Sequence, residues 1–178
     1  GLTGILSANG TGTTTLVGNS FTGEIHVRRG VVLLQQSQTG ASHGAIRIGV
    51  PGAESDLVGT PPNLSFNSTG VNLVTQIDRD IIVDNGGLTV SGKATRYSLV
   101  SSLSPLSNAT GSQTLTGDIT LTSDLRIQGG GGGTSATVGS TIFQGNISGP
   151  GKFWIPNGRV VFDTSSVLSN AGGLDMGD

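Results

Sequence analysis

The chain has 178 residues, enough for one domain, with 31 glycines, 34% hydrophobic residues and a formal net charge of −2. Its low charge and apolar content exclude an intrinsically disordered protein, and glycine without a three-residue period excludes a collagen-like helix. The nine Lys and Arg residues are scattered, so we expect neither nucleic acid nor an anionic membrane surface as a partner.

The first predicted elements are short apolar pairs between turn residues in residues 6–35. Ile25 alternates with Val27, and after a glycine Val31 alternates with Leu33. Alternation at a period of two indicates half-buried β-strands, because successive side chains point to opposite faces. The Gly and Asn residues between the pairs supply tight corners. Short strands joined in this way predict a chain that coils, with each turn lying on the one before.

The same stretch resembles the autotransporter-associated β-strand repeat of secreted bacterial autotransporters and large bacterial surface proteins. The matching residues are Gly10, Gly12, Thr13, Thr15, Leu16, Gly18, Asn19, Phe21, Thr22, Gly23, Ile25, Val27, Gly30 and Leu33. Members of that family form right-handed parallel β-helices. The resemblance therefore implies this fold and an extracellular place at a bacterial cell surface, and it implies no particular activity.

Further strands are expected along the rest of the chain wherever apolar residues alternate. They are centred on residues 46–50, 64–66, 71–73, 81–83, 88–90, 97–100, 115–127 and 142–162. Residues 51–62 and 101–112 are predicted to be projecting loops, and the glycine run 129–133 a surface excursion. No window has the spacing of an amphipathic helix, and none approaches the roughly 18 apolar residues of a membrane helix.

We predict one all-β domain over residues 1–178, a right-handed parallel β-helix (a β-solenoid) of roughly eight coils with about 20 to 25 residues each. Turn signals also recur as they do in a β-sandwich, which is the alternative fold. Internal repetition with glycines at matching places favours the solenoid. Because the pattern is already under way at the first residue, we expect a processed protein or a segment of a longer one.

Candidate catalytic groups are few. Asp78, Asp80 and Asp84 are the densest carboxylates, and Asp78 and Asp80 on one strand would share a face, as paired carboxylates do in polysaccharide-cleaving enzymes. The simpler interpretation is a solvated outer face with Arg79 beside them. The chain has no cysteine and only two histidines, without metal-ligand spacing. We therefore expect no enzyme activity, no cofactor and no metal, with calcium at residues 78–84 as an alternative.

The two ends of a β-solenoid expose unpaired strand edges, which natural solenoids cap. We see no polar cap or amphipathic helix at either terminus. The apolar residues there are Leu2, Ile5, Leu6, Val167, Leu168, Leu174 and Met176. We interpret them as an interface through which copies of this chain join head to tail by strand addition, which gives a filament. The predicted function is a non-enzymatic subunit, or repeating segment, of a bacterial surface fibre.

The alternative function is an autotransporter-like passenger adhesin that binds glycans through Tyr97, Trp154 and the projecting loops. A polysaccharide lyase or hydrolase is the third hypothesis. In a secreted protein, Asn-x-Ser/Thr sequences mark candidate glycosylation sites. Five are present, at Asn9, Asn63, Asn67, Asn108 and Asn146.

Overall fold

A computed structural model describes most of the chain. The described residues are 3–18, 20–40, 42–49, 62–67, 74–84, 89–90, 93–94, 97–102, 113–128, 140–157, 160–163 and 166–176. Within these ranges every regular element is a β-strand, which confirms the all-β prediction. The strand predicted at 71–73, residues 51–61 of the loop predicted at 51–62 and the glycine run at 129–133 lie outside them.

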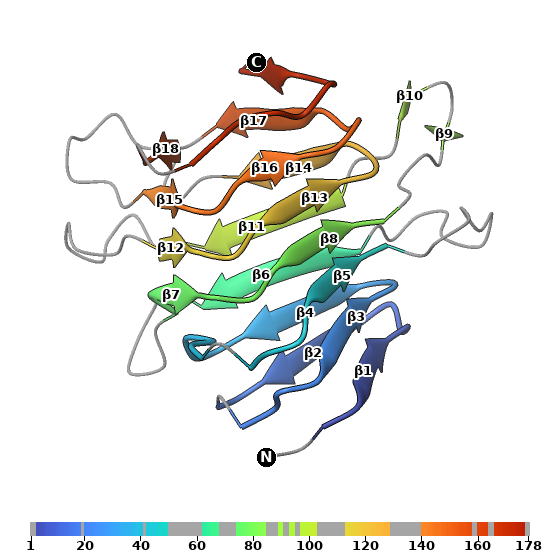
Figure 1. The fold of residues 1–178 in the computed structure, drawn as a ribbon. Helices are drawn as coiled ribbons and strands as arrows, with labels where there is room; N and C mark the ends of the chain where they lie inside the picture. Colours follow the sequence, from blue (N-terminus) through green and yellow to red (C-terminus); the bar gives the residue numbers. More distant parts are fainter. Residues whose placement is uncertain are drawn as a thin grey trace.

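The first sheet stacks six short strands in the order in which they occur along the chain (Figure 1). They are β1 (Ile5–Ala8), β3 (Glu24–Val27), β5 (Ile46–Ile48), β8 (Ile81–Val83), β13 (Ile119–Leu121) and β16 (Ile147–Ser148). All of their ladders are parallel. Beyond β16, Leu168 makes an isolated parallel bridge to Ile147.

The second sheet has seven strands and also follows the chain from one end to the other. They are β2 (Thr13–Leu16), β4 (Val31–Leu34), β6 (Asn63–Asn67), β11 (Tyr97–Ser102), β14 (Leu125–Gln128), β17 (Phe153–Asn157) and β19 (Leu174–Asp175). Their pairing is parallel throughout. Ser101 and Ser102 belong to β11, where they pair with Phe66 and Asn67. The loop predicted from residue 101 therefore starts too early, because ladder hydrogen bonds use the backbone and tolerate serine.

The third sheet is parallel and shorter. Its four strands are β7 (Gln76–Ile77), β12 (Gln113–Leu115), β15 (Thr141–Phe143) and β18 (Val160–Phe162). Gln38 adds a parallel bridge to Ile77 at its lower edge. The only described antiparallel ladder joins β9 (Thr89–Val90) to β10 (Lys93–Ala94). A sandwich of antiparallel sheets, the alternative fold, does not predict the parallel pairing of the three larger sheets.

The chain visits the sheets in turn. From β5 in the first sheet it passes to β6 in the second and β7 in the third, and then returns to the first sheet as β8 (Figure 1). We call each such round a rung; the first rung holds β1 and β2, and the last holds the Leu168 bridge and β19. Equivalent residues lie up to 39 positions apart, as Gln38 and Ile77 do. Such rungs are longer than the predicted 20 to 25 residues per coil. The largest sheet accordingly has seven strands, fewer than the roughly eight coils predicted.

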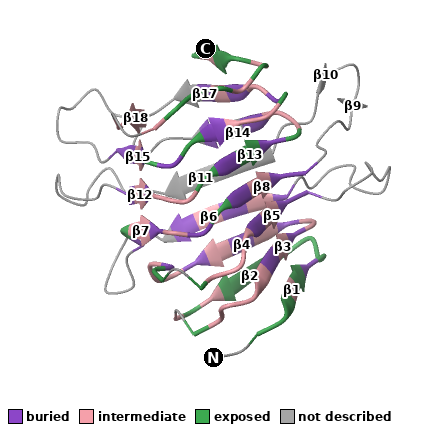
Figure 2. Ribbon diagram, in the orientation of Figure 1, coloured by how far each residue is buried: buried purple, intermediate pink, exposed green. Residues whose placement is uncertain are grey.

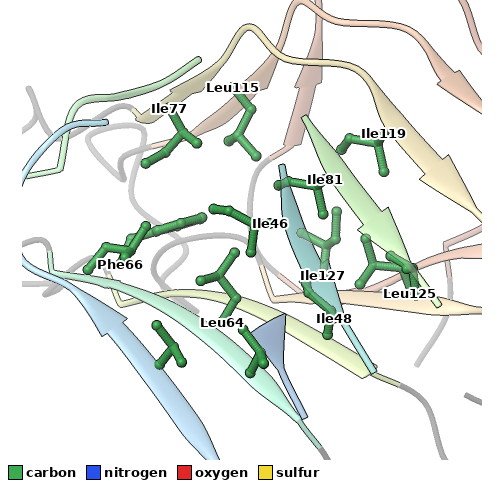
Figure 3. Packing of buried hydrophobic residues seen from close by; sticks show 14 of the residues in the cluster. Ile46, Ile48, Leu64, Phe66, Ile77, Ile81, Leu115, Ile119, Leu125 and Ile127 are labelled. Carbon is green, nitrogen blue, oxygen red and sulfur yellow. The ribbon is translucent and has the colours of Figure 1, made fainter. Parts of the chain in front are cut away.

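The core lies between the sheets and consists of stacked apolar columns (Figure 3). One column, which we call the Leu/Ile column, takes one residue from each rung of the first sheet. Its members are Leu6, Ile25, Ile46, Ile81, Ile119, Ile147 and Leu168. Near the C-terminal end the rings of Phe143, Phe153 and Phe162 pack together, with centroids 5.3 to 5.9 Å apart. Each rung is therefore buried by its neighbours above and below.

Candidate functional site

Arg79 lies inside the stack. Only 1% of it is exposed, and it is the largest fully buried side chain. It occupies the corner before β8, where the equivalent residues of other rungs are Gly23, Gly44 and Gly117. The prediction of a solvated face beside Asp78 is therefore wrong for this residue. At Gly23, Gly44 and Gly117 an added Cβ would instead meet the backbone of the preceding rung.

The guanidinium of Arg79 is bonded to earlier rungs. Nη1 donates to the carbonyl oxygens of Gly23 and Gly44, at 2.7 Å each, and Nη2 donates to that of Phe21. Nε donates to Gln38 Oε1 at 3.2 Å. The Phe21 ring lies 5.9 Å from the guanidinium carbon. Arg79 therefore joins three successive rungs by hydrogen bonds to carbonyls, and among the described residues no carboxylate pairs with it.

Asp78 and Asp80 lie at the corner between β7 and β8. The prediction that they share a strand is wrong, because neither residue belongs to one. Asp78 accepts hydrogen bonds from Gly40 N at 3.0 Å, Thr116 Oγ1 at 2.7 Å and Gln76 Nε2 at 2.6 Å. Burial raises the pKa of Asp78, but these three hydrogen bonds, together with the charge interaction with His43, outweigh it and hold the pKa below its usual value. The carboxylate thus connects its own rung with the rungs before and after it.

The same device recurs at other corners. The Asp80 carboxylate accepts the backbone N–H of Asp118 at 2.9 Å, and the Asp118 carboxylate accepts that of Asn146 at 2.8 Å. Asp124 accepts the N–H of Lys152 at 2.9 Å. In each pair the donor is the equivalent residue of the next rung. The carboxylates that suggested catalysis are engaged in holding rungs together.

A charged network covers the outer face of β3, β5 and β8. Arg47 Nη1 donates to both Asp84 oxygens, at 2.9 and 3.2 Å. His26 Nε2 lies 2.8 Å from Glu24 Oε2, and Arg47 Nε lies 3.8 Å from that oxygen. The hydrogen bond with His26 lowers the pKa of Glu24, the charge of Arg47 adds to this, and burial opposes it. The hydrogen bond to Asp84 raises the pKa of Arg47.

The side chains of this network link adjacent strands of the first sheet. His26 and Arg47 are neighbours in register on β3 and β5.

In the part of the chain that the structure describes, no group of three or more His, Cys, Asp or Glu side chains could hold a metal ion. The described part also has no helix long and apolar enough to cross a membrane.

The exposed apolar side chains gather at the two ends of the stack. Figure 2 shows exposed residues on β1 and β2 at one end and at the C-terminus, after β17, at the other. In the described ranges, every exposed large hydrophobic residue lies in the first or the last rung: Ile5, Val17, Val167, Leu168, Leu174 and Met176. Leu6 is half-buried against the core. Leu2 lies outside the described residues.

The C-terminal end has more of these exposed apolar side chains than the N-terminal end. Leu168 and Leu174 are in register with the buried residues Ile147 and Phe153, and they are 39% and 41% exposed. Met176, which follows β19, is 74% exposed. Leu168 and Leu174 continue the core columns to a point where no described rung covers them.

The two predicted glycan-contacting residues do not share a row. Tyr97 is in register with Leu125, which pairs with Phe153. Trp154 lies in the adjacent row, opposite Arg126, and is half-buried. The side chain of Tyr97 lies outside the described residues.

The candidate glycosylation sites differ in setting. Asn9 and Asn146 are exposed, at the corner after β1 and the corner before β16. Asn63 is half-buried in β6, and its Oδ1 is buried without a described hydrogen-bond partner. Asn67 ends β6, with a side chain outside the described residues, and Asn108 lies outside them altogether.

Sequence reasoning missed three residues. Val17 is exposed at the N-terminal end. The available signal was that it follows the apolar Leu16 directly in the sequence. The amide of the buried Gln113 has no described hydrogen-bond partner, and nothing local marks it as buried. Arg79 had no local signal, because its equivalence with Gly23, Gly44 and Gly117 is seen only in the register of the stacked strands.

Comparison of the chain with models of protein families, with curated proteins and with solved structures finds no match.

Proposed function

We propose that this chain is a structural, non-enzymatic segment of a bacterial extracellular fibre, folded as a right-handed parallel β-helix whose end rungs add further rungs. Three parallel sheets visited in turn support the winding. The right hand follows the general rule for parallel crossover connections. The resemblance of residues 10–33 to the autotransporter-associated repeat supports the same fold and the extracellular setting.

One observation carries the fibre proposal: the exposed large hydrophobic side chains of the described ranges are confined to the first and last rungs. Exposed apolar surface of this kind marks sites of association. Natural proteins usually protect sheet edges with charges, proline or bulges. Here the edge strands β1 and β2 contain no charged residue and no proline.

The polar groups of the corners support a structural role. Asp78, Asp80, Asp118 and Asp124 accept hydrogen bonds from neighbouring rungs. A carboxylate held by two or more such bonds is fixed in its ionised form, whereas a general acid needs a raised pKa. Asp78, the most heavily bonded of them, has a lowered pKa.

Electron microscopy and sedimentation velocity of the purified chain over a range of concentrations test the proposal. We expect unbranched filaments of uniform width, with a fibre-diffraction repeat of about 4.8 Å along the axis. The double variant Leu174→Lys, Met176→Lys places charges on the last rung and is expected to abolish the filaments. Thr120→Lys, an exposed position in the middle of the stack, is the matched control and is expected to leave them intact.

A wild-type chain that stays monomeric at the highest concentration contradicts the proposal. Filaments that survive the double charge on the last rung, with the fold retained by circular dichroism, contradict the role of the end faces.

A further inference from the structure

The corner glycines give the stack a direction. A Cβ added to Gly23 would overlap the carbonyl oxygen of Gly4, and one added to Gly145 would overlap that of Gly117. A Cβ on Gly172 would lie 2.5 Å from the backbone of Gly151. In each case the glycine meets the rung that precedes it in the chain. Close approach of a rung to its predecessor is therefore built into these corners.

At the N-terminal face the same kind of corner meets nothing. A Cβ on Gly12 would have no described atom within 4 Å, and one on Gly10 would meet only the nitrogen of Gly12, at 4.0 Å. Neither residue has a positive φ that would require glycine. These two glycines leave room for a preceding rung that the described chain does not supply.

The C-terminal face offers what such a rung needs. Leu168 ends the Leu/Ile column, whose first member is Leu6 on the N-terminal face. In the second sheet, a continuous row of paired residues starts at Thr13 and ends at Asp175. One rung placed on the other in the register of the stack would set Leu6 over Leu168 and Thr13 over Asp175.

The two faces also match in charge. Residues 3–18 contain no charged side chain, and residues 166–176 contain only Asp175, which already lies 3.5 Å from Lys152. Depletion of charge is typical of the buried centre of an interface. A single head-to-tail contact covers both faces at once, whereas contact between two N-terminal faces leaves the more apolar C-terminal face open.

We infer that the occupant of each end face is a second copy of this chain, joined in one register. Residues 3–18 of one copy lie on residues 166–176 of the preceding copy, with Leu6 paired to Leu168 and Thr13 to Asp175. The parallel ladders of the first and second sheets then continue across the junction without interruption. This inference rests on the proposed function and adds to it the polarity and the register of assembly.

Cysteine cross-linking tests the register directly, because the chain has no cysteine of its own. Two single variants, Thr13→Cys and Asp175→Cys, are mixed in equal amounts and oxidised. Paired residues on adjacent strands lie within the range of about 4.4 to 6.8 Å between Cα atoms that a disulfide needs. We expect a disulfide-linked dimer from the mixture, and monomers from either variant oxidised alone.

An off-register pair is the matched control. Thr15 is exposed on the same face of β2, two residues beyond Thr13, which places its Cα about 8 Å from that of Asp175 in the inferred junction. Thr15→Cys mixed with Asp175→Cys is expected to give at least about tenfold less dimer. Equal or greater cross-linking of this pair, or self-linking of Thr13→Cys alone, overturns the inference.

Sedimentation of the same mixtures before oxidation distinguishes failure of the inferred register from failure of the fibre proposal. Assembly without the Thr13–Asp175 cross-link refutes the register and polarity, and leaves the fibre proposal standing. Absence of assembly in these mixtures and in the wild-type chain refutes both. If one of the single-cysteine variants does not assemble although the wild-type chain does, the test uses Ser7→Cys mixed with Ser169→Cys instead. These two residues follow Leu6 and Leu168 in the same register.

Discussion

Arg79 is charged and buried, and its partners are carbonyl groups. Burial lowers the pKa of the guanidinium, which nevertheless remains charged at neutral pH because arginine is a very strong base. Its planar group presents several N–H donors in a fixed fork, and three backbone carbonyls and one amide oxygen receive them. A lysine has the charge without the fork, so Arg79 is specific to its position.

Substitution of Arg79 by alanine is expected to destabilise the chain by about 3 kcal/mol or more, because several buried carbonyls then lack a donor. Arg79→Lys is expected to fall between alanine and the wild type. Arg28→Ala, at a half-buried arginine, serves as the control and is expected to cost less than about 1 kcal/mol. Urea unfolding followed by circular dichroism measures these differences. An unchanged midpoint for Arg79→Ala would show that its hydrogen bonds contribute nothing net.

Asp78 makes stability depend on pH in the acid range. Its pKa is lowered in the folded chain, so the ionised carboxylate stabilises the fold above the ordinary aspartate pKa of about 3.9. This contribution is lost as the pH falls through the lower, folded value. We expect the free energy of unfolding to fall below about pH 4, and Asp78→Asn to reduce both that slope and, by about 1 kcal/mol, the stability at pH 7. Denaturant titrations from pH 7 to 3 measure how steeply the free energy of unfolding falls with pH. A slope for Asp78→Asn equal to that of the wild type would contradict this role.

At the scale of the element, the corners matter more than the strands. Most strands have only two to five residues, so few ladder hydrogen bonds hold each of them. The corners add glycines that allow close contact and carboxylates that accept the N–H groups of the next rung. The position of a rung is therefore determined at its corners, and the apolar columns fill the space between.

A methyl group at an inner corner is expected to be costly. Gly145→Ala places its Cβ on the carbonyl of Gly117 and should destabilise the chain by about 1 to 3 kcal/mol, as overpacking does. Gly10→Ala, the matched control, places its Cβ in open space and should change the stability of the monomer by less than about 0.5 kcal/mol. Thermal unfolding of both variants at low concentration makes the comparison. Equal effects would show that close approach of the rungs does not constrain these corners.

At the scale of the molecule, stability depends on neighbours. Among the described residues, an inner rung is covered on both sides, whereas the last rung is covered on one, as the exposure of Leu168 and Leu174 shows. In stacked structures of this kind, stability is the sum of the rungs and of the contacts between them. Each head-to-tail contact in the proposed fibre would add one more such interface.

The apparent melting temperature is therefore expected to rise with chain concentration, because association stabilises the folded state by mass action. The Leu174→Lys, Met176→Lys variant should melt at one temperature throughout the same range. Scanning calorimetry at several concentrations provides the measurement. A wild-type melting temperature independent of concentration would mean that the ends do not associate under those conditions.

Local pattern in the sequence was sufficient for the all-β class and for many strand positions. Alternation at Ile25 and Val27, at Ile46 and Ile48, and at Ile119 and Leu121 depends only on neighbouring residues, and each pair lies in a strand with both side chains buried. Strand positions follow from the sequence because the alternation of apolar side chains depends on short-range order.

Tertiary structure alone decided the lengths of the rungs and the burial and hydrogen-bond partners of the polar groups. The carbonyls that bind Arg79 belong to residues 35, 56 and 58 positions away, and the amide that binds the Asp80 carboxylate is 38 away. A period of two shows which side of a strand faces the core, but it does not show which distant residue lies above or below. Stacking brings those residues together, and so the burial of Arg79 and the carboxylate bonds between rungs were not predictable from the chain itself.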